Sequence, residues 1–98
     1  MGYNVTIANN GQHALELIEK NRSFDLIFMD ISMPIMDGIQ ATRILRSQRL
    51  TTPIIALTAH SMNSDHQNCL AAGMNDIVLK PIRSKELQRI SDRYLNRR

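Results

Sequence analysis

The sequence predicts an α/β fold, a doubly wound parallel β-sheet with helices on its faces. Two continuous apolar runs, at residues 26–29 and 53–57, have the length and composition of strands buried on both faces of a sheet. Segments with apolar residues at helical spacing lie between the strand-like runs. Alternation of strands and helices favours a parallel sheet with right-handed crossovers. At 98 residues we expect a single domain, residues 1–98.

The first half of the chain predicts two strands and two helices. An edge strand is expected at residues 3–7, where apolar and polar residues alternate. A turn at residues 9–11 leads into a helix that runs to about position 21. The apolar run that follows ends at Asp30. Asp37 is expected to cap the next helix, whose buried stripe is formed by Ala41, Ile44 and Leu45.

The second half continues the alternation. The strand at residues 53–57 ends at Thr58, and the helix after it is expected to stop at Gly73. A short strand at residues 77–79 ends at Lys80. Ser84 is then expected to cap a last helix, which completes four strands and four helices.

Composition is that of an ordinary globular protein. Its 43% hydrophobic content is sufficient for a core. No run approaches the roughly 20 apolar residues of a membrane span. The chain begins without a signal-peptide pattern and has one cysteine, Cys69, so we expect a cytoplasmic protein. The net charge of +3 comes from basic residues near the carboxyl end, and the few aromatic residues favour a solvated helix face over a nucleic-acid site.

Chemically useful side chains follow three of the predicted strands. Asp30, Thr58 and Lys80 each stand where a strand ends. In an open parallel sheet, ligand sites lie at the carboxyl ends of the strands. A lone buried acid is costly unless a cation meets it, so a carboxylate, a hydroxyl and an ammonium are expected to converge in one crevice.

Three segments carry a family resemblance. Residues 28–38 (FMDISMPIMDG), 56–60 (ALTAH) and 79–82 (LKPI) together resemble, in order and spacing, the receiver domain of two-component response regulators. The stretch from residues 58–62 through 69–76 is most similar to the receivers of hybrid sensor histidine kinases. The resemblance covers essentially the whole chain. It implies a flavodoxin-like fold and a place in a phosphorelay.

The resemblance also implies roles for single residues. Asp30 would be the phosphoacceptor, taking a phosphoryl group from a histidine of a histidine kinase or a histidine phosphotransfer protein. Lys80 and Thr58 would meet the negative charge of the phosphoryl group. Mg²⁺ would be held by Asp30 and the backbone carbonyl of Ser32, and the Lys80–Pro81 peptide bond is expected to be cis.

The sequence departs from the family at its beginning. The family's first strand, which is central in the sheet and ends in a metal-binding acidic pair, and its first helix have no counterpart, as expected of a truncated receiver or of a piece of a longer protein. We therefore expect an incomplete metal site that binds Mg²⁺ weakly or not at all. Either the strand at residues 5–7 moves into the vacant central position, or two chains associate and exchange or abut strands.

Two alternative functions stay open beside the phosphoacceptor. Without the acidic pair, the chain could act as an interaction or dimerisation module that needs no phosphorylation. A phosphohydrolase of the haloacid dehalogenase type is disfavoured, because that group carries a second acid where this chain has Ser32. We expect no conventional enzyme activity beyond self-phosphorylation from phosphohistidine or small phosphodonors. The three histidines and one cysteine lack a zinc-binding pattern.

Overall fold

The structure, a computed structural model, describes residues 4–21, 23–31, 35–59 and 63–95, with the side chains of all of these except 35–37 and 63–66. Within them, strands and helices alternate in the predicted order. The strands are β1 (Val5–Ala8), β2 (Leu26–Asp30), β3 (Ile54–Thr58) and β4 (Asp76–Leu79). The helices are α1 (Gly11–Lys20), α2 (Ile35–Ser47), α3 (Asn63–Ala72) and α4 (Ser84–Leu95).

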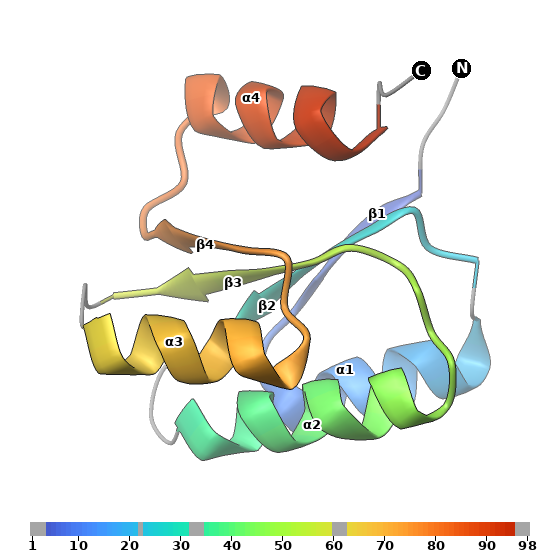
Figure 1. The fold of residues 1–98 in the computed structure, drawn as a ribbon. Coiled ribbons are helices and arrows are strands. Elements are labelled where there is room, and N and C mark those ends of the chain that lie inside the picture. The colour runs from blue at the N-terminus through green and yellow to red at the C-terminus, as the bar shows by residue number, and fades with distance from the viewer. Residues whose placement is uncertain (1–3, 22, 32–34, 60–62, 96–98) are drawn as a thin grey trace.

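The strands form one parallel sheet in the order β1-β2-β3-β4. Each crossover therefore moves by one strand in the same direction. Crossovers of one hand that all move in one direction place their helices on one face of the sheet. Accordingly α1, α2 and α3 lie together on one side of the sheet, and α4, which follows the last strand, lies on the other (Figure 1).

β1 lies directly beside β2, in the position expected for the missing central strand. Val5 pairs with Leu26 and Ala8 pairs with Met29. Two hydrogen bonds of 2.7 Å between Asn4 and Asp25 fix the start of this pairing. The first of the two predicted arrangements, in which this strand moves into the vacant position, is confirmed.

Side-chain alternation divides the core into two layers. Ile27, Met29, Ile54 and Ala56 belong to the layer that packs against α1, α2 and α3. The other layer packs against α4, with Ile90 at its centre, and its strand residues are Leu26, Phe28, Ile55, Leu57 and Val78. Residues of β2 and β3 are thus buried on both faces, as their continuous apolar runs predict.

β1 is covered on one face only. Its register sets Val5 and Ile7 beside Leu26 and Phe28, hence on the face that α4 covers elsewhere. Val5 is nevertheless 41% exposed and Ile7 54% exposed. The edge strand therefore presents an apolar strip to solvent. We call Val5 and Ile7 the β1 strip.

Two helix boundaries test the predicted caps. α2 begins at Ile35, so the prediction that Asp37 caps this helix is wrong: Asp37 lies inside the first turn. Pro34 directly precedes that start in the sequence, and proline favours the first turn of a helix. Gly73 follows α3 with a φ of 117°, which confirms its predicted role as a helix stop.

Arg46 joins three segments at the amino-terminal edge of the sheet, opposite the strand ends that carry the candidate site. Its guanidinium donates to the carbonyl oxygens of Leu50, Thr52 and Gly73 and to the side-chain oxygen of Asn75, at 2.8–3.0 Å. Burial lowers the pKa of Arg46, because the charged form loses contact with water. These bonds hold the end of α2 against the starts of β3 and β4.

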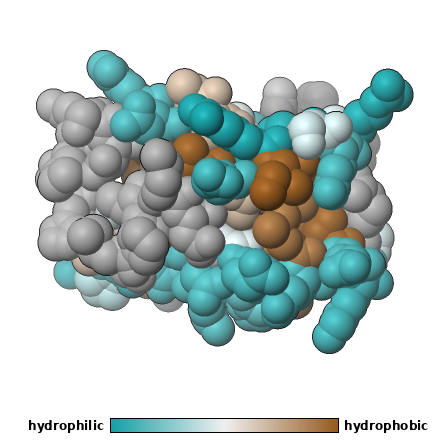
Figure 2. All heavy atoms as spheres, turned by 90° about the horizontal axis from the view of Figure 1, so that it is seen from below, coloured by the Kyte–Doolittle hydropathy of each residue, from teal (hydrophilic) through white to brown (hydrophobic). Residues whose placement is uncertain are grey.

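The outer face of the helical layer carries a hollow with both apolar and polar lining residues. Figure 2 shows apolar surface bordered by polar residues on this side of the molecule. A hollow of about 440 Å³ is lined by Leu15, Ile18, Glu19, Ile44 and Gln48 of α1 and α2. In the part of the chain that the structure describes, no helix has the length and apolarity needed to cross a bilayer.

Candidate functional site

The three predicted site residues lie at one end of the sheet. Asp30 is the last residue of β2, Thr58 is the last residue of β3, and Lys80 directly follows β4. Because the strands are parallel, their carboxyl ends share one edge. The strand register pairs Asp30 with Leu57 and Thr58 with Leu79, so the three residues are staggered by one residue from each strand to the next.

Asp30 and Lys80 form an ion pair across β3. The Lys80 ammonium donates to both carboxylate oxygens of Asp30, at 2.9 and 3.1 Å. Their side chains are 27% and 33% exposed, respectively. The cation expected to offset the desolvation of Asp30 is therefore Lys80.

Backbone hydrogen bonds fix where these side chains start. The Lys80 N–H donates to the Thr58 carbonyl at 2.8 Å, and the Ile31 N–H donates to the Leu57 carbonyl at 2.9 Å. The sheet ladder thus continues one residue past the strand ends that carry the chemistry. Thr58 itself is 4% exposed, so its side chain is buried at the end of β3.

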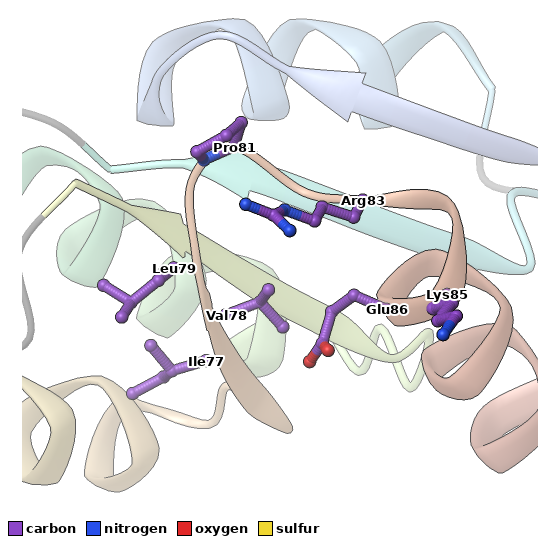
Figure 3. Close-up of a pocket in the computed structure, with 7 residues that line it drawn as sticks. All are labelled: Ile77, Val78, Leu79, Pro81, Arg83, Lys85 and Glu86. Carbon is purple, nitrogen blue, oxygen red and sulfur yellow. The ribbon is translucent and has the colours of Figure 1, made fainter.

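The loop after β4 leads from the ion pair to a surface hollow. The Lys80–Pro81 peptide bond is cis, as the resemblance implies. Beyond it, residues of β4, this loop and the first turn of α4 line a hollow of about 590 Å³: Ile77, Val78, Leu79, Pro81, Arg83, Lys85 and Glu86 (Figure 3). Glu86 also forms an ion pair with Arg89. The hydrogen bond from Arg89 and the negative charge of Glu86 raise the pKa of Arg89.

The described residues offer few protein ligands for a magnesium ion. Mg²⁺ requires near-octahedral oxygen ligands, usually including more than one charged or substrate oxygen. Among the described residues, no three His, Cys, Asp or Glu side chains lie close enough to hold a metal ion. Both oxygens of Asp30 accept from Lys80. Ser32, whose carbonyl the resemblance offers as a ligand, lies outside the described residues.

One residue at this edge receives no site role from the sequence alone. The pair Ala8 and Met29 is the last in the register of β1 and β2, and the next residues are Asn9 and Asp30. In the sequence Asn9 belongs to an ordinary Asn-Asn-Gly turn. Its relation to Asp30 depends on the position of β1 beside β2, and no sequence signal distinguishes it.

Comparisons with known proteins agree on one family. The family model for the response regulator receiver domain matches residues 1–92. The transcription factor SKN7 of Saccharomyces cerevisiae is 45% identical over 97 residues, which cover 99% of this chain and 15% of that protein. The Escherichia coli signal transduction histidine-protein kinase BarA is 41% identical over 96 residues, which cover 96% of this chain and 10% of that protein.

Solved structures agree with this result. The receiver domain of sensor histidine kinase PA1611 from Pseudomonas aeruginosa, with a magnesium ion in its active-site cleft, is 32% identical, with a TM-score of 0.71 over 99% of this chain and 100% of that chain. A two-component response regulator from Clostridium difficile shares the fold at 22% identity, with a TM-score of 0.83 over 98% of each chain. The chain therefore belongs to the response regulator receiver domain family.

Proposed function

We propose that Asp30 accepts a phosphoryl group from a histidine of a partner protein, with Lys80 and Thr58 meeting the charge of that group. The observation that carries the proposal is the ion pair between Asp30 and Lys80 at the carboxyl edge of the sheet. It holds a carboxylate nucleophile next to a cation that can move to phosphoryl oxygens. Membership of the receiver family supports the same role.

In the transfer, one bond to phosphorus forms as another breaks. One Asp30 oxygen attacks phosphorus, and the bond from phosphorus to the donor's nitrogen or oxygen breaks, with its electron pair leaving on the donor. Lys80 holds both Asp30 oxygens before the transfer. It must release the attacking oxygen and follow the charge onto the phosphoryl oxygens. Its one-third exposed side chain leaves room for that movement.

We propose a histidine kinase or a histidine phosphotransfer protein as the partner. In Saccharomyces cerevisiae, a receiver domain of the same fold, that of Ssk1, has been crystallised with the phosphotransfer protein Ypd1, with a TM-score of 0.78 to this chain. The same proposal places the chain in the cytoplasm, where such partners act. It also treats the chain as a single receiver domain. We further infer that this chain binds Mg²⁺ weakly, because its described residues offer one carboxylate that is already paired.

Acetyl phosphate provides the direct test. The chain is incubated with acetyl phosphate with and without Mg²⁺, and the intact mass is then measured. The proposal predicts a species heavier by one phosphoryl group that Asp30→Asn abolishes.

Asp25→Asn is the matched control, because Asp25 directly precedes the other end of β2. This variant should be phosphorylated like the natural chain. A folded chain that gains no phosphoryl group, or one that gains it equally in Asp30→Asn, would contradict the proposed role of Asp30.

A second function is favoured by the uncovered side of β1: self-association. We infer that two chains pair through β1. It is an edge strand, so half of its backbone N–H and C=O groups point away from β2. The β1 strip adds exposed apolar side chains along the same edge. Antiparallel pairing of two β1 strands would continue the sheet and merge the two strips about a two-fold axis.

A further inference from the structure

Asn9 directly follows β1, the strand that pairs with β2, and Asp30 is the last residue of β2. The register of β1 and β2 ends with Ala8 beside Met29, and Asn9 and Asp30 are the next residues along the two chain segments. Neighbouring strands lie roughly 4.8 Å apart. Side chains two positions apart in an extended segment point to the same face, so Asn9 follows Ile7 and Asp30 follows Phe28. Because Ile7 and Phe28 pair on one face, alternation assigns Asn9 and Asp30 to that face. Their side chains thus leave neighbouring chain segments at the same edge and on the same face of the sheet.

The surrounding hydrogen bonds leave the Asn9 side chain available. Its backbone N–H donates to His13 Nδ1 at 2.9 Å, which holds the residue in place. Asn10, in contrast, accepts from the His13 N–H at 2.8 Å and caps α1. Among the described residues, the side-chain amide of Asn9 has no hydrogen-bond partner, and the residue is exposed.

Charge decides what such a pair of residues can bind. A divalent cation beside Asp30 must compete with Lys80 for the same two oxygens. A second carboxylate would offset that competition, whereas the amide of Asn9 brings an oxygen without charge. Ligand charge is one of the main determinants of the affinity of oxygen-ligand sites.

We propose that Asn9 sets the low divalent-cation affinity of this site, by placing a neutral amide where a second carboxylate would complete a site with Asp30. The inference rests on the proposed function of Asp30, because the cation concerned is the one that would assist transfer to it. It goes further because it names Asn9 as the residue that limits the affinity of the site for this cation. A single change, Asn9→Asp, should therefore create a cation site.

Binding of Mn²⁺ to the whole chain tests this without any phosphodonor. The bound fraction is measured from the electron paramagnetic resonance signal of unbound Mn²⁺, with Mg²⁺ as competitor. Asn9→Asp should bind Mn²⁺ roughly tenfold more tightly than the natural chain or better, as expected for one added carboxylate ligand. The backbone bond to His13 survives this substitution, so the variant should fold, and far-ultraviolet circular dichroism checks that it does.

Two further variants make the test specific. Asn21→Asp adds the same charge at the other end of α1, where an aspartate can still accept from Ser23, and should leave Mn²⁺ affinity unchanged. Asn9→Asp combined with Asp30→Asn should lose the gain. Equal gains in Asn9→Asp and Asn21→Asp, or a gain that survives loss of Asp30, would overturn the proposal. Because no phosphoryl transfer is measured, failure of the phosphoacceptor role leaves this result interpretable.

Discussion

Lys80 Nζ lies 2.9 and 3.1 Å from the two carboxylate oxygens of Asp30, although the residues are 50 positions apart. The parallel sheet makes this contact possible, because it sets the ends of β2 and β4 on either side of β3. The charge of the nucleophile is thereby matched before any donor arrives. The pair is partly exposed, so its contribution to stability should be small while its contribution to chemistry is large.

Replacement of Lys80 tests that separation. Lys80→Met should change the free energy of unfolding by less than about 1 kcal/mol, because a partly solvated ion pair stabilises little. The same change should slow phosphorylation of Asp30 by at least about tenfold, since the phosphoryl oxygens lose their cation. Denaturant melts and the time course of intact mass measure the two effects. Lys85→Met, on α4 beside the hollow that follows β4, should leave phosphorylation at the natural rate. An equal loss of rate in Lys85→Met would show that the effect comes from net charge.

The hydroxyl of Thr58 is expected to act after transfer. Thr58→Val keeps the volume of this buried side chain and removes only the hydroxyl. It should permit phosphorylation of Asp30 and weaken the response of the neighbouring segment. Hydrogen exchange of α3 with and without acetyl phosphate measures that response. If Thr58→Val and the natural chain respond alike, the hydroxyl has no signalling role.

The sequence predicts the strands, the helices and the site triad because each depends on local pattern. The apolar runs of β2 and β3 are continuous because both faces are buried, and each ends at a residue whose polarity is visible in one dimension. The family motifs then predict the cis Lys80–Pro81 bond. The prediction for Asp37 is wrong because an aspartate followed by glycine is typical of a cap, whereas the start of the helix is also determined by the residues before it.

The sequence leaves open which strands pair with each other and in which register. Two arrangements satisfied the rule that backbone groups be paired, and the register of β1 on β2 distinguishes them. The relation of Asn9 to Asp30 depends on that register. The contacts of Arg46, up to 29 positions away in sequence, are equally invisible in the local pattern of α2, because they depend on where α3 ends.

Arg46 should be among the residues on which stability depends most. Arg46→Ala removes bonds to three carbonyl oxygens and one amide oxygen, several of them partly buried. Leaving such acceptors unpaired should lower the free energy of unfolding by about 2–4 kcal/mol. Urea unfolding measures this. Arg43→Ala, an exposed arginine on the same helix, is the control and should change stability by less than about 0.5 kcal/mol. Equal effects of the two changes would refute the role of Arg46.

Gly73 is constrained twice. Its φ of 117° disfavours any side chain, and a Cβ there would lie 2.8 Å from Arg46 Cγ. Gly73→Ala should therefore destabilise the chain by roughly 1–3 kcal/mol. Part of this cost comes from the clash with Arg46, so the combined variant with Arg46→Ala should lose less stability than the sum of the two. A strictly additive double-mutant cycle would show that backbone conformation alone sets the cost.

The β1 strip should control self-association. Ile7 is 54% exposed, and in a pair of chains joined through β1 each copy would bury it against the other. Ile7→Thr keeps β propensity and removes apolar area from both copies, which should weaken association by about tenfold or more, given the roughly 0.8 kcal/mol per buried methylene. Sedimentation equilibrium over a range of concentrations measures the association constant. Ile44→Thr changes the same residue type on the outer face of α2, where Ile44 is 39% exposed, and should leave association unchanged. If Ile44→Thr weakens self-association and Ile7→Thr does not, the interface lies on the helical layer. A natural chain that stays monomeric at every concentration would rule out pairing through β1.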